Sequence, residues 1–177
     1  MTSVTDARGK VSTFEFNVQG DLVKATDPLG HFVTYEYDLS GRLNKTTDAL
    51  GNSTTYGYNT ARQLDKVTDP LLGQTTRSFD NRRNVASITN ALGNVVESYL
   101  YDQRNRLTQT TDAKGLTTRI DYDAAGLVRQ ITDRANRLTT FIRDEKNRLT
   151  SINRSNGQNT SMQYDVPRPS VQHKNPD

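Results

Sequence analysis

The sequence predicts an all-β fold in which tandem 21-residue repeats form an antiparallel meander of β-hairpins. The segment 26–30 (TDPLG) recurs as 47–51 (TDALG), and the aromatic segment 35–37 (YEY) recurs as 56–58 (YGY). Residues near the aromatics alternate between apolar and polar types, as half-buried strands do. Self-similarity of this period is typical of arrays in which each unit completes its core with residues of its neighbours.

Each unit begins with Thr-Asp-x-x-Gly, continues through Thr-x-Tyr-x-Tyr-Asp and x-x-Gly-Arg-Leu, and returns to the next Thr-Asp. Successive units are 21 residues apart except for the 22-residue step from Thr89 to Thr111. Gly93 keeps its usual distance from Thr89, whereas Tyr99 and Tyr101 come one residue late, so we expect a β-bulge before these tyrosines. The units begin at Thr5, Thr26, Thr47, Thr68, Thr89, Thr111, Thr132 and Asn153.

The first arm of each unit is expected to be a strand with one apolar face. Its aromatics stand two positions apart, with a polar or small residue such as Glu36 or Gly57 between them. Because successive side chains of a strand point to opposite faces, the aromatics share one face. We expect Tyr56 and Tyr58, in the middle of the array, to be core residues.

The second arm carries aliphatic residues three positions apart, as in Leu64 and Val67 or Leu149 and Ile152. A regular strand would place such residues on opposite faces, so we expect a bulge or a strand end that turns the second one inward. A helix accepts this spacing too, but the flanking turns leave too few residues for a stable one.

Two turn signals per unit predict two strands per unit. In segments 27–30, 38–41 and 123–126, Asp starts the turn, where its carboxylate accepts backbone N–H groups, and Gly ends it, where a positive φ costs little. The strands are expected near residues 32–38, 42–47, 53–59, 64–68, 95–102, 106–111, 117–123 and 127–132.

Some units depart from the pattern. Leu72 takes the usual glycine position, with Gly73 after it. Asn136 also replaces a glycine, and this replacement should disturb the turn little, because Asn tolerates the left-handed region. Arg77 and Arg143 interrupt the aromatic ladder, and we expect Arg143 to mark a frayed edge.

The composition agrees with a thin repeat array. Apolar residues make up 32% of the chain and the mean hydropathy is −0.80, values that alone would indicate disorder. A repeat array, however, buries a narrow stripe instead of a large central core. The net charge of +3 comes from 23 basic and 20 acidic residues, and the basic ones are spread over the repeats. This spread predicts a solvated surface and no specific nucleic-acid site.

Several kinds of site are not predicted. The chain has no cysteine, which excludes disulfides and cysteine-ligated zinc. His31 and His173 have no partner at metal-ligand or catalytic spacing, so we expect no cofactor, metal or enzyme activity. The turn Asp residues could form a calcium ladder, but calcium-binding β-helix repeats have a shorter, glycine-rich period, which favours turn capping. The first residues contain no apolar run typical of a signal peptide or membrane span, and the chain begins almost inside a repeat, as a fragment would.

The repeat signature resembles the YD repeat of the RHS family. The resemblance rests on segments 37–43 (YDLSGRL) and 47–52 (TDALGN), and on further copies at 101–107 and 122–123. The predicted repeat array spans residues 1–165, and residues 166–177 form an irregular, proline-containing tail. The signature residues are Tyr35, Tyr37, Asp38, Gly41, Arg42, Leu43, Tyr56, Tyr58, Tyr101, Asp102, Tyr122 and Asp123.

The family includes bacterial Rhs proteins, the C component of insecticidal toxin complexes, wall-associated proteins and animal teneurins. The resemblance implies a β-sheet that spirals into a hollow shell, which in bacterial members encloses a C-terminal toxin domain. The implied partners are the rest of the shell and that toxin, in an exported or extracellular bacterial parent. Full-length members self-cleave near an Asp-Pro-x-Gly-Leu sequence, but segments 27–30 and 69–73 lie in ordinary repeat turns, so no protease is predicted.

Two functions of different classes remain open. The first is a structural wall segment of an RHS-type shell, and the second is a module that binds carbohydrate or a cell surface. Tyrosines exposed in a row would favour binding, whereas tyrosines packed on neighbouring strands would favour the wall; Tyr35, Tyr56 and Tyr122 are the test cases. An open sheet also leaves unpaired edges, so we expect the isolated chain to self-associate, with segment 143–146 (RDEK) blunting one edge.

Overall fold

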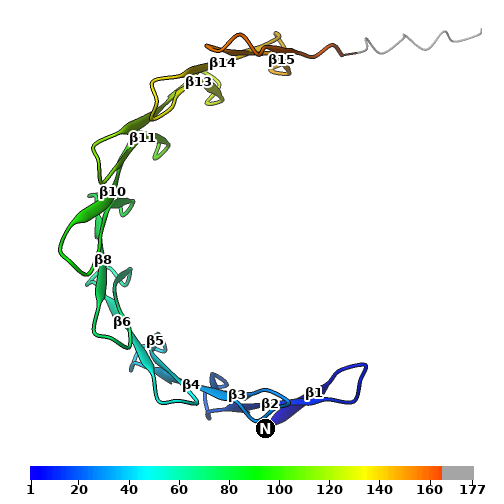
Figure 1. The fold of residues 1–177 in the computed structure, drawn as a ribbon, viewed down its shortest axis with the longest axis vertical. Helices are drawn as coiled ribbons and strands as arrows, with labels where there is room; N and C mark the ends of the chain where they lie inside the picture. The colour runs from blue at the N-terminus through cyan, green and yellow to red at the C-terminus, as the bar shows by residue number, and fades with distance from the viewer. Residues whose placement is uncertain (165–177) are drawn as a thin grey trace, which may run out of the picture.

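The computed structural model describes residues 1–164 as one open antiparallel sheet, in which every strand pairs with the next along the chain (Figure 1). This confirms the all-β meander, and the observed strands match the expected ranges to within one residue. No helix in residues 1–164 is long and apolar enough to cross a membrane. The strands are β1 (Thr2–Thr5), β2 (Val11–Phe16), β3 (Leu22–Thr26), β4 (Phe32–Tyr37), β5 (Leu43–Asp48), β6 (Ser53–Tyr58), β7 (Leu64–Thr68), β8 (Gln74–Phe79), β9 (Val85–Thr89), β10 (Val95–Tyr101), β11 (Leu107–Asp112), β12 (Thr117–Tyr122), β13 (Val128–Thr132), β14 (Leu138–Arg143), β15 (Leu149–Arg154) and β16 (Thr160–Ser161).

The sheet is a single layer that curves into an arc (Figure 1). Within the described range, no second layer covers either face, and no residue is fully buried. The prediction that Tyr56 and Tyr58 are core residues is therefore wrong: both are half-buried. Side chains on a lone sheet are covered only by their lateral neighbours, so even a central aromatic keeps one side open to solvent.

The second-arm spacing of three is explained by a bulge. Tyr56 pairs with Val67 and Tyr58 pairs with Leu64, because the register shifts between Gly57 and Tyr58. Both aliphatics thus lie on the face of the tyrosines, which we call the tyrosine face. The same shift recurs in every hairpin that joins a first arm to the second arm of its unit.

The extra residue of the 22-residue step forms a bulge in β10, at the place that the sequence predicts. The pairing of β10 with β9 shifts between Val95 and Glu97, ahead of Tyr99 and Tyr101. The insertion therefore stays local, and the tyrosines return to the tyrosine face.

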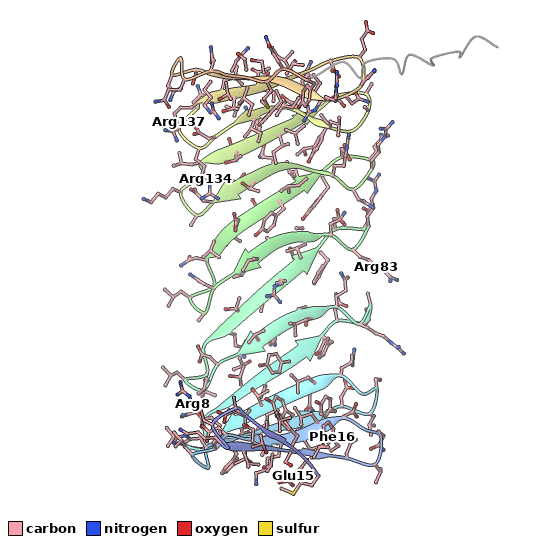
Figure 2. All side chains as sticks on the ribbon, turned by 90° about the vertical axis from the view of Figure 1, so that its right-hand side faces the viewer. Arg8, Glu15, Phe16, Arg83, Arg134 and Arg137 are labelled. Carbon is pink, nitrogen blue, oxygen red and sulfur yellow. The ribbon has the colours of Figure 1, made fainter. Side chains whose placement is uncertain are left out.

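The turns form two rims along the sheet. We call them the TD rim, with turns at 6–9, 27–30, 48–51, 69–72, 90–93, 112–115, 133–136 and 154–157, and the YD rim, with turns at 17–20, 38–41, 59–62, 80–83, 102–105, 123–126 and 144–147. Figure 2 shows Arg8, Arg134 and Arg137 along the TD rim and Arg83 along the YD rim. In every turn the N–H of the last residue donates to the carbonyl of the first, and that last residue has a positive φ.

Leu72, Asn136 and Arg143 keep the local geometry of their counterparts in the other units. Leu72 and Asn136 adopt positive φ values of 68° and 59° at the glycine position. The expectation of a frayed edge at Arg143 is wrong, because β14 pairs with β15 along its length and Arg143 itself pairs with Leu149. Segment 143–146 therefore enters an interior turn of the YD rim and blunts no edge strand. Self-association through β1 and β16 stays a prediction.

Candidate functional site: the Asp-Arg-Tyr clamp

The signature residues of one unit meet a tyrosine of the next unit at the YD rim. Asp38 Oδ1 accepts the backbone N–H groups of Ser40 (2.8 Å) and Arg42 (3.0 Å), which caps the turn. Its Oδ2 accepts Nε (2.7 Å) and Nη2 (2.6 Å) of Arg42. These hydrogen bonds, with that of the Arg42 side chain the largest, lower the pKa of the Asp38 carboxyl. Gly41 completes the turn with a φ of 75°.

The arginine held in this way lies on the next unit. Its guanidinium carbon is 4.5 Å from the centroid of the Tyr58 ring, and the Tyr58 hydroxyl donates to the carbonyl of Leu43 at 2.8 Å. We call the set Asp38, Arg42 and Tyr58 a clamp. The stacking and the tyrosine hydrogen bond together contribute on the order of 1–2 kcal/mol. A clamp therefore links adjacent units through their side chains, in addition to the backbone hydrogen bonds between their strands.

The clamp recurs twice more along the rim. Arg106 pairs with Asp102 and lies 4.2 Å from the Tyr122 ring centroid, and Tyr122 donates to the Leu107 carbonyl at 2.8 Å. The third clamp joins Asp144, Arg148 and Tyr164 in the same way, with Tyr164 donating to Leu149. All three clamps share the pattern Asp-x-x-(Gly/Asn)-Arg-Leu followed by a tyrosine sixteen residues after the arginine, and this pattern marks a joint with the following unit.

Other positions on the rim carry part of the clamp. Tyr37 donates to the Leu22 carbonyl at 2.9 Å, but the turn before it supplies Asn17 and Asp21 instead of an Asp-Arg pair. Asp123 caps its turn through the Leu127 N–H at 2.9 Å. Arg143 takes the place of the tyrosine, because its Nη1 donates to the Val128 carbonyl at 2.7 Å. A guanidinium can reach this carbonyl as a phenol does, which explains why the strand does not fray.

The remaining predicted tyrosines lie on the tyrosine face without a clamp. Tyr35, Tyr56 and Tyr101 are all half-buried. The Tyr56 hydroxyl is 3.4 Å from Thr46 Oγ1 on the adjacent strand, and burial raises the pKa of Tyr101. Of the three test residues, none is exposed, and the ring of Tyr122 lies beneath Arg106. This packing on neighbouring strands favours the wall over a stacking surface for sugars.

The family model for the RHS repeat matches residues 1–31, 16–53, 37–71, 84–118 and 122–158. The chain belongs to the RHS repeat family. Among solved structures, it is similar to the TcdB2-TccC3 chain (17% identity over 85% of this chain and 10% of that chain, TM-score 0.71). It is also similar to a mutant Tc holotoxin pore of Photorhabdus luminescens (16% identity, 86% and 9%, TM-score 0.72) and to TcdB2-TccC3-Cdc42 (16%, 82% and 9%, TM-score 0.70). This RHS segment therefore spans about a tenth of the length of the chains it matches, and no curated relative matches it.

The YD rim of this RHS segment also holds a group of arginines whose turns are far apart in the sequence. Arg62, Arg82, Arg83 and Arg104 are all exposed at three successive turns. In the sequence these arginines are spread over several repeats, but residues one repeat apart become neighbours when the repeats stack in register. Their shared position within the repeat was the signal that could have revealed them.

The carboxylates of the turns hydrogen-bond within their own turns. Asp27, for example, accepts the N–H of Leu29 and of His31, and the His31 side chain contacts it at 2.9 Å and lowers its pKa. Residues 1–164 contain no group of three or more His, Cys, Asp or Glu side chains arranged to hold a metal ion. His173 lies outside the described residues. The turn Asp side chains thus behave as caps, as the sequence favours.

Proposed function

We propose that this chain is a wall segment of an RHS-type shell, and that in its parent protein the shell encloses a C-terminal toxin domain. The observation that carries the proposal is the clamp, which uses the signature residues to join one unit to the next. A wall needs continuity between units more than it needs a pocket. The curvature of the sheet (Figure 1) supports the same role, since further units would extend the arc around an enclosed space.

In this proposal the segment supplies no catalytic group. The acidic side chains of the signature are engaged in capping, and the clamp tyrosines donate to backbone carbonyls. Carbohydrate binding by the tyrosines receives no comparable support, because Arg42 and Arg106 lie on the faces of Tyr58 and Tyr122 that a sugar would stack upon.

The full reading frame that contains residues 1–177 gives the decisive experiment. It is expected to encode further repeats and a variable C-terminal domain, which should resist protease in the intact protein. Replacing Tyr58 and Tyr122 by Ala should open the wall and expose that domain to cleavage, whereas Thr55→Ala, at an exposed site of β6, should leave it protected. Equal digestion of the domain in wild type and both variants would overturn the enclosing role.

A glycan array separates the wall from the binding module. The wall predicts that the chain and its Tyr35→Ala and Tyr56→Ala variants give the same signals on neutral glycans. A neutral sugar bound by the wild type and lost in either variant, with the fold retained by circular dichroism, would make the binding module the better description.

A further inference from the structure

The middle of the YD rim carries an excess of positive charge. Three successive turn segments, 59–63, 80–84 and 102–106, contain five arginines and only two acidic residues, Asp80 and Asp102. Arg106 is engaged in a clamp, and Arg82 donates to the Asp102 carbonyl at 2.8 Å. In the described structure, Arg62, Arg83 and Arg104 make no ion pair. We call Arg62, Arg82, Arg83 and Arg104 the arginine strip.

Two residues of the strip stand where an arginine is unfavourable. Arg62 and Arg83 have φ values of 65° and 70°, in the left-handed region, where a Cβ comes too close to the following carbonyl oxygen. The other YD turns place glycine or asparagine at this position, namely Gly20, Gly41, Asn105, Gly126 and Asn147. Neither guanidinium forms a hydrogen bond within the described part of the chain that would offset this cost. The turn requires this φ but not an arginine, and strained residues of this kind cluster at functional positions.

Hydrogen bonds between turns hold the strip in register. Gln63 Nε2 donates to the Arg83 carbonyl at 2.8 Å, which ties the first turn to the second. Asn84 Nδ2 donates to Asn105 Oδ1 at 3.1 Å, which ties the second to the third. Successive turns are two strands apart, or about 10 Å. The strip is therefore a preorganised row of cations at wide, regular spacing.

We infer that the arginine strip binds an acidic polysaccharide that runs along the YD rim. A guanidinium binds a carboxylate or sulfate through paired hydrogen bonds, and repeated acidic groups on a linear glycan would meet repeated arginines. A uronate polymer carries its charges sparsely, as the strip does. Duplex DNA carries one charge per ~1.7 Å, and single strands need exposed aromatic faces for stacking. On this rim, Arg42 and Arg106 lie over the Tyr58 and Tyr122 rings.

The test uses the 177-residue chain with polygalacturonate as the probe and neutral dextran as the reference, by titration calorimetry near physiological ionic strength. The double variant Arg62→Asn, Arg83→Asn should bind polygalacturonate at least about tenfold more weakly and yet have a higher melting temperature, because Asn accepts the left-handed region. The double variant Arg62→Lys, Arg83→Lys keeps the charge but loses the paired hydrogen bonds, so its affinity should lie between that of the wild type and that of the Asn variant. These opposite shifts in binding and stability would not arise from a merely structural arginine.

The matched control replaces Arg8 and Arg119 by Asn, which removes the same charge from exposed sites outside the strip. It should bind polygalacturonate as the wild type does. Equal weakening in the control and in the strip variant would overturn the inference in favour of nonspecific net charge. Binding of a DNA duplex more tightly than the polysaccharide through the same residues would assign the strip to nucleic acid instead. The inference stands apart from the wall role, since protease protection of an enclosed domain does not involve Arg62 or Arg83.

Discussion

The two rims of the sheet share one turn geometry and differ in what their side chains reach. On the TD rim, the side chain of Asp48 accepts hydrogen bonds from Leu50 and Asn52, all within one turn. On the YD rim, Asp38 caps its turn in the same way, but its partner Arg42 extends onto Tyr58 of the next unit. Turn formation and the joining of units are therefore separate tasks. An arginine at the fifth turn position joins units where a tyrosine follows sixteen residues later; Arg137 of the TD rim pairs with Asp133 in the same way, but Asn153 stands at that position.

The exposed tips of the rims differ as well. Leucines at the tips of successive TD turns are almost free of contacts, with Leu50 88% and Leu71 91% exposed. The central YD turns instead present arginines, and bonds such as that from Gln63 to Arg83 run from turn to turn. Side-chain contacts of this kind on the TD rim gather near one end of the described sheet, where Arg134 reaches Glu97 at 3.0 Å and Asp112 at 3.6 Å. The clamps, by contrast, recur along the YD rim, so we expect the YD rim to be the more rigid of the two.

Acid should unfold the whole array, because carboxylates cap turns on both rims. Hydrogen bonds lower the pKa of Asp27 and Asp48 on the TD rim and of Asp38 and Asp102 on the YD rim. A folded-state pKa below the unfolded value of about 3.9 contributes stability that is present above that value and is lost as the pH falls through the folded pKa. As the pH is lowered from 7 to 2, the melting temperature should therefore stay constant at first and then fall steeply below about pH 4.

Asn variants of one cap on each rim should differ in stability. Asp38→Asn removes a charge that also positions Arg42, so it should lower the melting temperature at pH 7 more than Asp48→Asn does. Each variant should depend less on pH in the acid range than the wild type. A melting temperature that rises on acidification would contradict the capping role of the carboxylates.

Truncating a clamp tyrosine should be the most damaging single substitution. Tyr58→Ala removes a half-buried ring, its hydrogen bond to Leu43 and the surface on which Arg42 stacks, so we expect a loss of about 2 kcal/mol. This is smaller than the ~3 kcal/mol of a buried aromatic, because the ring keeps a solvent-exposed side. Tyr58→Phe should lose about 1 kcal/mol. Urea unfolding of the wild type and the two variants measures these losses of stability. An unchanged midpoint for Tyr58→Ala would mean that the clamp does not stabilise the sheet.

The repeat period was enough to predict most of the fold. The placement of Tyr99 one residue late predicted the bulge in β10, and the spacing of Leu64 and Val67 predicted the one in β7. Turn chemistry predicted the caps. These features are local, and a residue's own repeat contains all the information they need.

The sequence did not predict what depends on several repeats at once. The burial of Tyr58 depends on whether a second layer covers the sheet, and no pattern in one strand reports this. The contact of Arg42 with Tyr58 joins residues sixteen positions apart, and it follows only once the rim and the strand direction are known. Arg143 was misread because its residue type was weighed without the carbonyl of Val128 that it can reach.

A smaller effect is expected from Arg42, which joins its turn to the next unit. Arg42→Ala should lose about 1 kcal/mol, since its stacking on Tyr58 and its pair with Asp38 are only partly shielded from solvent. Asn52→Ala, at the equivalent position of a TD turn, should lose less than about 0.5 kcal/mol because its contact stays within the turn. Equal losses would show that the two rims are held alike.

The smallest effect concerns a strained residue on the TD rim. Leu72 has a φ of 68° and is 80% exposed, so its side chain gains little from burial while its backbone occupies the left-handed region. Leu72→Gly should relieve that strain, and the greater freedom of glycine in the unfolded chain should offset part of the gain, leaving about 0.5 kcal/mol of added stability. Gly51→Leu is the matched reciprocal, because Gly51 has a φ of 86° and a Cβ there would meet open space, so strain alone should destabilise it. Urea midpoints that move in opposite directions would support the strain account. A destabilised Leu72→Gly would instead mean that the exposed leucine makes a contact that matters, and that the TD rim is held together by more than its turns.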